Sequence, residues 1–482
     1  MVPVVPEEDS YAAEVKEYLR IQNVILTASP SSKQAMSATD TRYQAFDANE
    51  ESAQFLAFEW IYTSSDVSRL SDEQIVQRWI LSSLYFATNG DEWIDNEGWI
   101  EPTVHECNWY GVTCLGGEVS KLELSQNHLV GELIPEISLL KDTLYVLSLG
   151  NDFDAEEEEK NEFIMASLPS SLGDLPALTY LNLENCGLRG SIPRYFFSEW
   201  MHLESLYLNG NDLTGTIPKS IQHLSSIEVL WLGGNNLGGS IISEIGDLTS
   251  LKDLNLENNY RQDVSGQRGF ITSVPAELNQ LINLESLSLA DNSLSGLVPN
   301  LSELISLRQL QLSGNYFEGR LPPALGRLEM LEELDLSYNW LSSTIPQEYG
   351  NMISLTSLNL QSNYNDEQGY FTWGIKSTIP SELGQLKNLR HINLSDNYIT
   401  GTLMKELGQL PRLQTMHLQN NDIAGPIPTE YSNLASLREI LLQDNSIDRE
   451  LYSMPEEICH LPQLELARVD CDVSCSCCLS TC

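Results

Sequence analysis

The sequence predicts an α/β repeat solenoid, a curved horseshoe whose concave face is a parallel β-sheet. The phrase L-x-x-L-x-L-x-x-N recurs thirteen times from Leu122 onward, and nine of its twelve spacings are 23 to 25 residues. Repeats of this period stack into solenoids and bury one continuous core. The chain has 482 residues, more than one compact core usually serves, which also favours a repeat array.

The leucines of each L-x-L predict a strand, because side chains of alternating polarity face opposite sides of a strand. Next comes L-x-G-x-I-P, as at Leu213–Pro218, where proline ends strand pairing. A segment such as Ser381–Leu389 follows, and its apolar spacing of three to four predicts a helical or 3₁₀ turn. Because these turns are wider than strands, we expect the stack to curve with its strands inside.

The ninth position of each unit lies where the chain leaves the strand. A buried turn leaves backbone N–H and C=O groups unpaired, and an asparagine amide offers donors and an acceptor for them. We therefore expect a ladder of buried side chains. Its predicted members are Asn127, Asp152, Cys186, Asn211, Asn235, Asn259, Asn292, Asn315, Asn339, Asn363, Asn397, Asn421 and Asn445. Cys186 fits as a small buried residue with a weak S–H donor.

A solenoid exposes its core at both ends, so the sequence should supply caps. Residues 71–87 have apolar side chains at helical spacing, with a capping box at Ser71 and Gln74. An earlier helix is expected over residues 10–27, followed by a linker over residues 28–41. The predicted domains are residues 1–39 (helix and linker), 40–117 (helical N-terminal cap), 118–450 (repeat array) and 451–482 (cysteine-rich C-terminal cap).

The full consensus, L-x-x-L-x-L-x-x-N-x-L-x-G-x-I-P, resembles that of plant-type leucine-rich repeat proteins, such as receptor-kinase ectodomains and polygalacturonase inhibitors. The stretch CNWYGVTC, Cys107 to Cys114, is similar to their N-terminal cap motif C-x-W-x-G-V-x-C. The stretch from Arg42 to Trp93 and the cysteine-rich tail resemble more closely the leucine-rich repeat proteins of diatoms. The resemblance implies the fold and a receptor-like role, and it leaves the ligand open.

Eight of the nine cysteines lie near the two ends of the predicted array. Cys107 and Cys114 are expected to form a disulfide, and even pairing suits an oxidising compartment. The other six are Cys459, Cys471, Cys475, Cys477, Cys478 and Cys482. They predict a cap with three disulfides of open connectivity. A soft-metal cluster is the alternative, although adjacent cysteines rarely suit one tetrahedral site.

Three units carry an insert after the ladder position: Phe153–Phe163, Tyr260–Gly269 and Tyr364–Gly374. All three are expected to project from one lateral edge, where loops often bind partners. The aromatic residue that starts each insert is expected to pack against the strand below it. The remaining aromatics Tyr370, Phe371 and Trp373 are candidate binding residues; a packed or solvated loop is the alternative. The acidic first insert lacks the spacing of a calcium loop, which favours a solvated loop.

The inner face of the predicted sheet supplies the other candidate ligand residues. Tyr180, Tyr207 and Trp231 fall in consecutive units and predict an aromatic cluster without a core to fill. The further candidates are Asn255, Gln311, Asp335, Asn359 and Asn393. Aromatic and amide groups together suit a glycan or an extended peptide.

Two sequons, Asn300-Leu-Ser and Asn393-Leu-Ser, are predicted glycosylation sites. A glycan on Asn393 would obstruct the inner face locally. No catalytic motif stands out, so the chain is not expected to be an enzyme, and no metal or cofactor is predicted. A catalytic cluster of His391, His417 and Asp335 is the alternative to ordinary solvated residues.

The net charge of −42 repels nucleic acid and anionic membrane surfaces, and no apolar run of 18 residues predicts a membrane span. The chain's start lacks the basic region of a signal peptide, yet its cysteines suit an oxidising compartment, so we expect an incomplete N-terminus. The predicted function is extracellular or cell-surface recognition of a protein, peptide or glycan, with a possible co-receptor. The alternatives are an inhibitor of a wall-degrading glycosidase and an adhesive or matrix protein.

Overall fold

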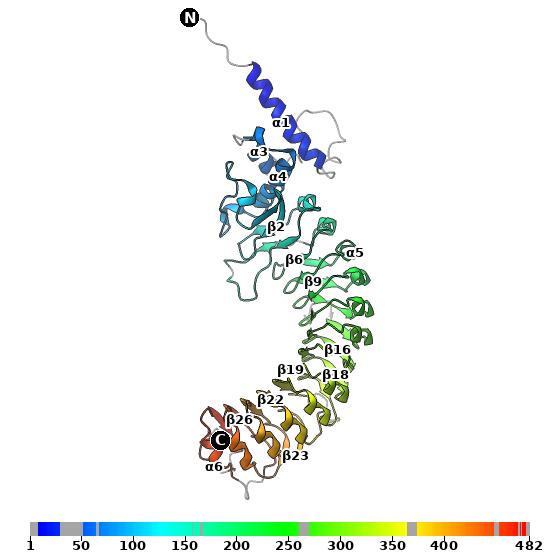
Figure 1. The fold of residues 1–482 in the computed structure, drawn as a ribbon, viewed down its shortest axis with the longest axis vertical. Helices are drawn as coiled ribbons and strands as arrows, with labels where there is room; N and C mark the ends of the chain where they lie inside the picture. Colours follow the sequence, from blue (N-terminus) through cyan, green and yellow to red (C-terminus); the bar gives the residue numbers. More distant parts are fainter. Residues whose placement is uncertain are drawn as a thin grey trace. The chain divides into compact units, whose positions relative to one another are not determined.

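The computed structural model describes residues 8–28, 52–63, 67–156, 158–163, 167–259, 269–363, 374–447, 453–470, 473 and 475–478. The chain divides into two compact units, Met1–Thr214 and Gly215–Cys482. Figure 1 colours these from blue at the first residue to red at the last. Among the described residues, no helix combines the length and the apolar character that crossing a bilayer requires.

The first unit begins with a helical cap. Its α-helices are α1 (Glu8–Ala28), α3 (Ala53–Thr63) and α4 (Asp72–Ala87), with 3₁₀ turns η2 (Val67–Arg69), η3 (Gly90–Glu92) and η4 (Glu106–Asn108). Both predicted helices are thus confirmed. The capping box is also confirmed, because Ser71 Oγ accepts from Gln74 N and Gln74 Oε1 accepts from Ser71 N. The predicted linker, residues 28–41, lies outside the described residues beyond Ala28.

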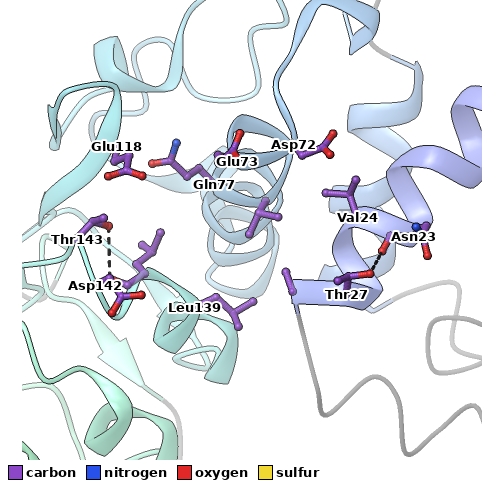
Figure 2. A pocket seen from close by; sticks show the side chains of 13 residues that line it. Asn23, Val24, Thr27, Asp72, Glu73, Gln77, Glu118, Leu139, Asp142 and Thr143 are labelled. Carbon is purple, nitrogen blue, oxygen red and sulfur yellow. Dashed lines mark hydrogen bonds between the residues drawn. The ribbon is translucent and has the colours of Figure 1, made fainter.

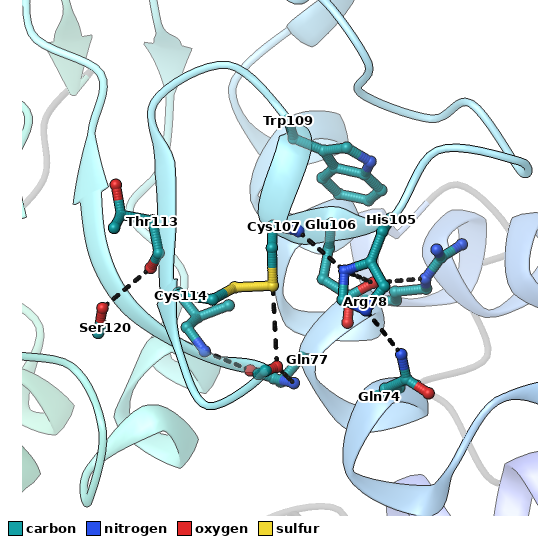
Figure 3. Close-up of a disulfide and its surroundings, with 12 residues drawn as sticks. Gln74, Gln77, Arg78, His105, Glu106, Cys107, Trp109, Thr113, Cys114 and Ser120 are labelled. Carbon is teal, nitrogen blue, oxygen red and sulfur yellow. Dashed lines mark hydrogen bonds and ion pairs between the residues drawn. A yellow bond between two sulfur atoms is a disulfide. The ribbon is translucent and has the colours of Figure 1, made fainter.

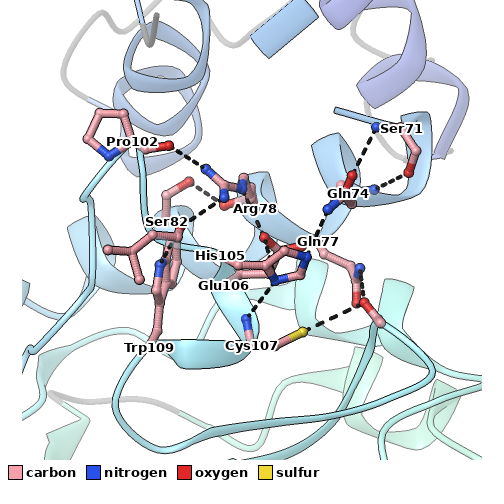
Figure 4. Close-up of polar contacts among 12 residues, drawn as sticks. Ser71, Gln74, Gln77, Arg78, Ser82, Pro102, His105, Glu106, Cys107 and Trp109 are labelled. Atoms are coloured by element: carbon pink, nitrogen blue, oxygen red, sulfur yellow. Dashed lines mark hydrogen bonds and ion pairs between the residues drawn. The ribbon is translucent and has the colours of Figure 1, made fainter. Parts of the chain in front are cut away.

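A buried ion pair holds this cap together. Arg78 Nε donates to Glu106 Oε2 at 2.9 Å, and the two side chains are 6% and 0% exposed. Arg78 also donates to the carbonyl of Val104 at 2.9 Å (Figure 4). Beside this pair lies the predicted disulfide between Cys107 and Cys114, which is confirmed (Figure 3).

Gln77 of α4 connects the cap to the first repeat strand. Its Oε1 accepts from Val119 N at 2.5 Å, and its Nε2 donates to Gly117 O at 3.3 Å (Figure 3). The two bonds pair backbone groups at and just before the start of β2 (Glu118–Glu123), whose edge is also covered by the antiparallel strand β1 (Val112–Leu115). The cap therefore covers the first strand through polar bonds as well as apolar contacts.

The repeat strands follow in the predicted order. In the first unit, β1 (Val112–Leu115) pairs antiparallel with β2, and β2, β4 (Val146–Ser148), β6 (Tyr180–Asn182) and β8 (Ser205–Tyr207) pair in parallel. Shorter strands of this unit are β3 (Val130–Gly131), β5 (Glu162–Phe163), β7 (Arg189–Ser191) and β9 (Asp212–Gly215), with turns η5 (Pro135–Leu140), η6 (Ser170–Asp174) and α5 (Phe196–Glu199).

The second unit carries a longer parallel sheet. Its strands are, in spatial order, β10 (Val229–Trp231), β13 (Asp253–Asn255), β15 (Ser286–Ser288), β17 (Gln309–Gln311), β19 (Glu333–Asp335), β21 (Ser357–Asn359), β22 (His391–Asn393), β24 (Thr415–His417), β26 (Glu439–Leu441) and β27 (Leu466–Arg468). We call the solvent-facing side of these ten strands the sheet face. Within this unit, Figure 1 shows the coils bending with the sheet face on the inner side, as predicted.

Most coils of the second unit return through a short 3₁₀ turn; the coil between β15 and β17 has none, and the last coil has the short helix α6 (Glu456–Cys459) instead. These turns are η7 (Lys219–His223), η8 (Ser243–Asp247), η9 (Ala276–Gln280), η10 (Pro323–Arg327), η11 (Gln347–Asn351), η12 (Ser381–Gln385), η13 (Lys405–Gln409) and η14 (Thr429–Asn433). A side sheet comprises β12 (Gly239–Ser240), β14 (Phe270–Thr272), β16 (Ser293–Leu297), β18 (Tyr316–Gly319) and β20 (Trp340–Leu341). The remaining elements are β11 (Asn236–Leu237), β23 (Thr400–Thr402) and β25 (Asp422–Ala424).

The predicted asparagine ladder is present. Asn315 is representative: its Nδ2 donates to the carbonyls of Leu289 in the preceding coil and Leu312 in its own, and its Oδ1 accepts from Leu294 N. Asn339 repeats this pattern one coil later with Leu312, Leu336 and Phe317. Asn315 and Asn339 thus each pair buried backbone groups of two coils at once.

The prediction of Asp152 as a ladder residue is wrong, and the first insert, Phe153–Phe163, explains why. Asp152 is exposed, whereas Asn161 is 1% exposed and donates from Nδ2 to Leu124 O and Leu149 O. The backbone N–H of Asn161 donates to Asn151 Oδ1 at 2.7 Å, and Asn151 Nδ2 donates back to Asn161 O at 2.8 Å. The insert therefore precedes its rung, and these two asparagines join its ends. Phe153 is 94% exposed, so the prediction that it packs on the strand below is also wrong.

Cys186 replaces a rung as predicted. Its Sγ lies 3.2 Å from the carbonyls of Leu149 and Glu184, the acceptors that an asparagine amide would reach. The residue is fully buried, and this burial raises the pKa of its thiol. The thiol is therefore a structural donor and a poor nucleophile.

The C-terminal cap contains two of the three predicted disulfides. They join Cys459 to Cys477 and Cys475 to Cys478. The remaining two predicted partners, Cys471 and Cys482, lie outside the described residues. The first disulfide connects the C-terminal tail, which follows β27, to the last residue of α6.

Replacing Asn315 with alanine should lower the free energy of unfolding by roughly 2–4 kcal/mol, because buried carbonyls and an N–H lose their partner. Urea denaturation followed by circular dichroism measures the change. Asn283 is an exposed amide that donates to Thr249 O, so Asn283→Ala should cost less than about 1 kcal/mol. Equal losses in the two variants would contradict the ladder's role.

Arg78→Ala should destabilise the first unit by roughly 3–5 kcal/mol, because it leaves Glu106 buried without its counter-charge. Thermal unfolding measures the loss. The double variant Arg78→Met with Glu106→Leu removes both charges while retaining volume, and it should recover most of the stability. If the double variant is as unstable as Arg78→Ala, the uncompensated charge is not the cause.

Candidate functional site

The sheet face presents an ordered row of side chains across its strands. Strand register places neighbours of this row side by side: Trp231, Asn255, Ser288, Gln311, Asp335, Asn359, Asn393 and His417. Six of the predicted ligand residues therefore lie on one line of the second unit. The structure brings them together in an order that a ligand crossing the strands would meet.

The amides of this row are partly engaged within the sheet. Asn255 Oδ1 accepts from Glu257 N at 3.0 Å, and Asn359 Oδ1 accepts from Gln361 N at 3.1 Å. Asp335 Oδ1 accepts from Ser337 N in the same way, and its other oxygen accepts from Asn359 Nδ2 at 3.1 Å. Each residue thus closes the end of its own strand. Their amide oxygens contribute more to local structure than the sequence suggested.

An acidic segment, of which the sequence analysis predicted only Asp335, occupies the first half of the sheet face. We define it as Asp253, Glu257, Asp291 and Asp335. Glu257 Oε2 accepts from Ser288 Oγ at 2.6 Å, which holds its carboxylate over β15. Asp291 feels the charges of both Glu257 and Asp335, and Asp253 that of Glu257. Asp253, Glu257 and Asp291 lie outside the middle positions of L-x-L, so a wider scan of strand ends could have found them.

Burial raises the pKa of two members of this segment, Asp253 and Asp291. Burial raises the pKa of Asp253, and the nearby Glu257 charge adds to the effect, while bonds from Trp231 and Ser286 oppose it. The pKa of Asp291 is raised by burial first and then by Glu257 and Asp335. A cationic group placed here would relieve this crowding of like charges.

The other half of the sheet face carries histidine and arginine. His417 Nε2 lies 3.0 Å from Glu439 Oε2, and burial lowers the pKa of His391 with help from Arg390. Asp335 bonds Ser337 and Asn359 and lies three strands from His417. This arrangement does not assemble His391, His417 and Asp335 as a catalytic cluster.

In the first unit, Tyr180 and Tyr207 form an aromatic pair. Their ring centroids are 5.5 Å apart and the planes are tilted by 45°, on neighbouring strands β6 and β8. Both rings are half-buried, so part of each surface faces solvent. The third member of the predicted cluster, Trp231, lies on β10, the first strand of the second unit's sheet.

The first unit also contains a cleft that the sequence analysis did not predict. It encloses about 500 Å³ between α1, α4, the start of β2 and η5 (Figure 2). Its apolar lining includes Val24, Val76 and Leu139, and its acids are Asp72, Glu73, Glu118 and Asp142. Asp72 pairs with Arg20 at 3.0 Å. No sequence signal places α1 and η5 side by side on α4, so the cleft follows from tertiary packing.

Several other candidates remain predictions. Tyr370, Phe371 and Trp373 lie outside the described residues, as do most of the second and third inserts. Asn300 is exposed, as a glycosylation site requires. Asn393 is half-buried and donates from Nδ2 to Gln361 Oε1 at 2.9 Å, so a glycan there would have to break this bond.

The side sheet carries exposed aromatics that the sequence analysis missed. The rings of Tyr316 and Trp340 are 4.7 Å apart, and Trp340 is 36% exposed. Tyr338 is 56% exposed beside them in sequence. Each occupies a variable position next to a ladder asparagine, a position that the repeat phrase does not mark.

The stacked coils, the asparagine ladder and the repeat phrase together define a leucine-rich repeat solenoid, similar to that of plant-type leucine-rich repeat proteins. Family models described as "Leucine rich repeat" match residues 176–237 and 376–423, and a second model matches residues 283–304, 306–328 and 330–352. These matches fall in both units.

The chain is similar to plant receptors. It is 34% identical over 160 residues to serine/threonine-protein kinase BRI1-like 2 of Arabidopsis thaliana, a match covering 33% of this chain and 13% of that protein. The solved peptide hormone receptor RGFR1, in complex with RGF2, is 28% identical with a TM-score of 0.62, over 72% of this chain and 50% of that one. The PEPR1–AtPEP1 structure is 29% identical with a TM-score of 0.65, over 83% and 55%. The chain thus spans about half of these solved receptors and a smaller share of the curated relative.

Asp253→Asn should raise the urea midpoint at pH 7 and leave it unchanged near pH 3. The folded-state pKa of Asp253 lies above its ordinary value of 3.8, so its ionised form disfavours folding at neutral pH. That penalty disappears as pH falls below 3.8, where both states are protonated. The exposed acid Asp247 is the control, and Asp247→Asn should shift neither midpoint. A gain for Asp253→Asn that persists at pH 3 would contradict this reasoning.

Proposed function

We propose that this chain is the recognition part of a receptor-like protein of the cell surface or extracellular space, and that its sheet face binds an extended peptide. The observation that carries the proposal is the row of in-register side chains, Trp231 to His417, across eight parallel strands of the second unit. The strands already pair their own backbone groups, so a ligand on this face is recognised by side chains. A row with one position per coil suits a ligand that is itself extended.

The charges of the sheet face favour a peptide with a basic group. The acidic segment offers carboxylates, to which lysine, arginine or a terminal amine donates strong charge-assisted bonds. The opposite half carries His391, Arg390 and Arg468, which suit a carboxylate or a polar end. This polarity would fix the direction in which a peptide lies across the strands.

The similarity to solved receptors supports a peptide over the other ligand classes. The titles of two such structures name complexes, RGFR1 with RGF2 and PEPR1 with AtPEP1, and the first is called a peptide hormone receptor. The glycosidase-inhibitor and matrix alternatives remain predictions, as does a co-receptor. No described contact favours them over a peptide.

A phage-displayed library of random twelve-residue peptides, selected on the full chain, tests the proposal. We expect enrichment of peptides with at least one basic residue. The isosteric variant Asp253→Asn, Glu257→Gln, Asp291→Asn should bind the enriched peptides at least tenfold more weakly, because it removes charge from the acidic segment.

The matched control neutralises three exposed acids on the opposite side of the coils: Glu277→Gln, Glu303→Gln and Glu329→Gln. It makes the same change in net charge, so it should retain the affinity of the wild-type chain. No enrichment at all, or equal weakening in both triple variants, would refute binding at the sheet face.

A further inference from the structure

The described part of the C-terminal cap gathers five sulfur atoms. Cys459 is the last residue of α6, and Met454 lies shortly before that helix. Cys475, Cys477 and Cys478 come from the tail that folds back against it. Thioether and thiolate sulfurs are the ligands that soft metal ions prefer.

The spacing of these sulfurs is close to that of a metal site. Cys475 Sγ lies 3.9 Å from Cys477 Sγ, and the sulfurs of Cys459, Cys475 and Cys477 all lie within 4.8 Å of one another. Two sulfurs that each bind one ion at about 2.3 Å lie at most about 4.6 Å apart, so small side-chain movements suffice. The disulfides of Cys477 with Cys459 and of Cys475 with Cys478 already hold the four residues at this range.

Met454 adds a fifth sulfur atom, which lies next to Cys475 and Cys478. Its Sδ lies 3.4 Å from Cys475 Sγ and 3.8 Å from Cys478 Sγ. The methionine is 4% exposed, whereas the four cysteines are half-buried. An ion could therefore enter from the cysteine side and rest against a buried thioether. A thioether among thiolates favours Cu(I) over harder ions.

We propose that the reduced C-terminal cap binds one Cu(I) ion through Cys459, Cys475 and Cys477, with Met454 as a further sulfur ligand. Each of the two disulfides first takes two electrons and two protons from a dithiol reductant, which is itself oxidised to a disulfide. The four thiols so formed can then ligate, and each cysteine that binds the ion releases its proton. Disulfide and metal are alternative cross-links between the tail and α6, and the redox state selects between them.

The test uses the full chain, reduced with a phosphine, freed of reductant and handled without oxygen. Cu(I) is added in the presence of a chromophoric Cu(I) chelator, and the loss of chelator colour measures transfer to the protein. We expect one tightly held Cu(I) per reduced chain and none for the oxidised chain. Cys477→Ser should abolish this binding, and Met454→Leu, which keeps every cysteine and a similar volume, should weaken it at least tenfold.

Two control variants locate the site. Cys114→Ser removes a thiol of the N-terminal cap, and the double variant Cys471→Ser, Cys482→Ser removes the remaining tail thiols; both should retain the ion. Circular dichroism of each reduced variant checks that the coils remain folded. The proposal fails if reduced wild-type chain holds no more Cu(I) than Cys477→Ser, if Met454→Leu binds as tightly as wild type, or if the double tail variant loses the ion.

Discussion

The ladder of side chains at the coil turns, asparagines with Cys186 in one place, is the interaction on which the solenoid depends. Leucine burial drives the coils together, but it is non-directional and does not pair the backbone groups where each strand ends. The amide of Asn315 supplies those bonds to its own coil and to the one before it. Because such a rung bonds two neighbouring coils, it fixes the register of their strands relative to each other. This fixed register places the side chains of the sheet face in straight rows.

The sheet face shows how structural and recognition roles share the same residues. Asn359 and Asp335 each close a strand end with one oxygen, and this fixes the remaining polar atoms in place. Fixed polar atoms lose little conformational freedom when a ligand arrives, which favours affinity. The crowded carboxylates of Asp253 and Asp291 add the opposite feature, an unfavourable charge that a cation would relieve. The rigid scaffold and the uncompensated carboxylate charge together favour the binding of a cationic ligand on this face.

The sequence predicted the fold well because the repeat phrase reports burial directly. Leucine spacing located the strands, the ladder and the 3₁₀ turns, and the capping box at Ser71 located α4. Prediction failed where the pattern was interrupted: the insert after Asn151 displaced the rung from Asp152 to Asn161. It also missed Asp253, Glu257 and Trp340, which occupy variable positions, and the cleft beside α1, which arises from contacts distant in sequence. Tyr180 and Tyr207 were found because their strand positions could be counted.

The pairing of Asn151 with Asn161 has a consequence for how such a protein can change. Their reciprocal hydrogen bonds close the base of the first insert. The neighbouring coils therefore keep the same contacts for any sequence placed between the two residues. New sequence can be grafted there without disturbing the core, since longer loops add little to the entropy of closure. The surface sequence between these two asparagines is therefore free to vary while the coils keep their contacts.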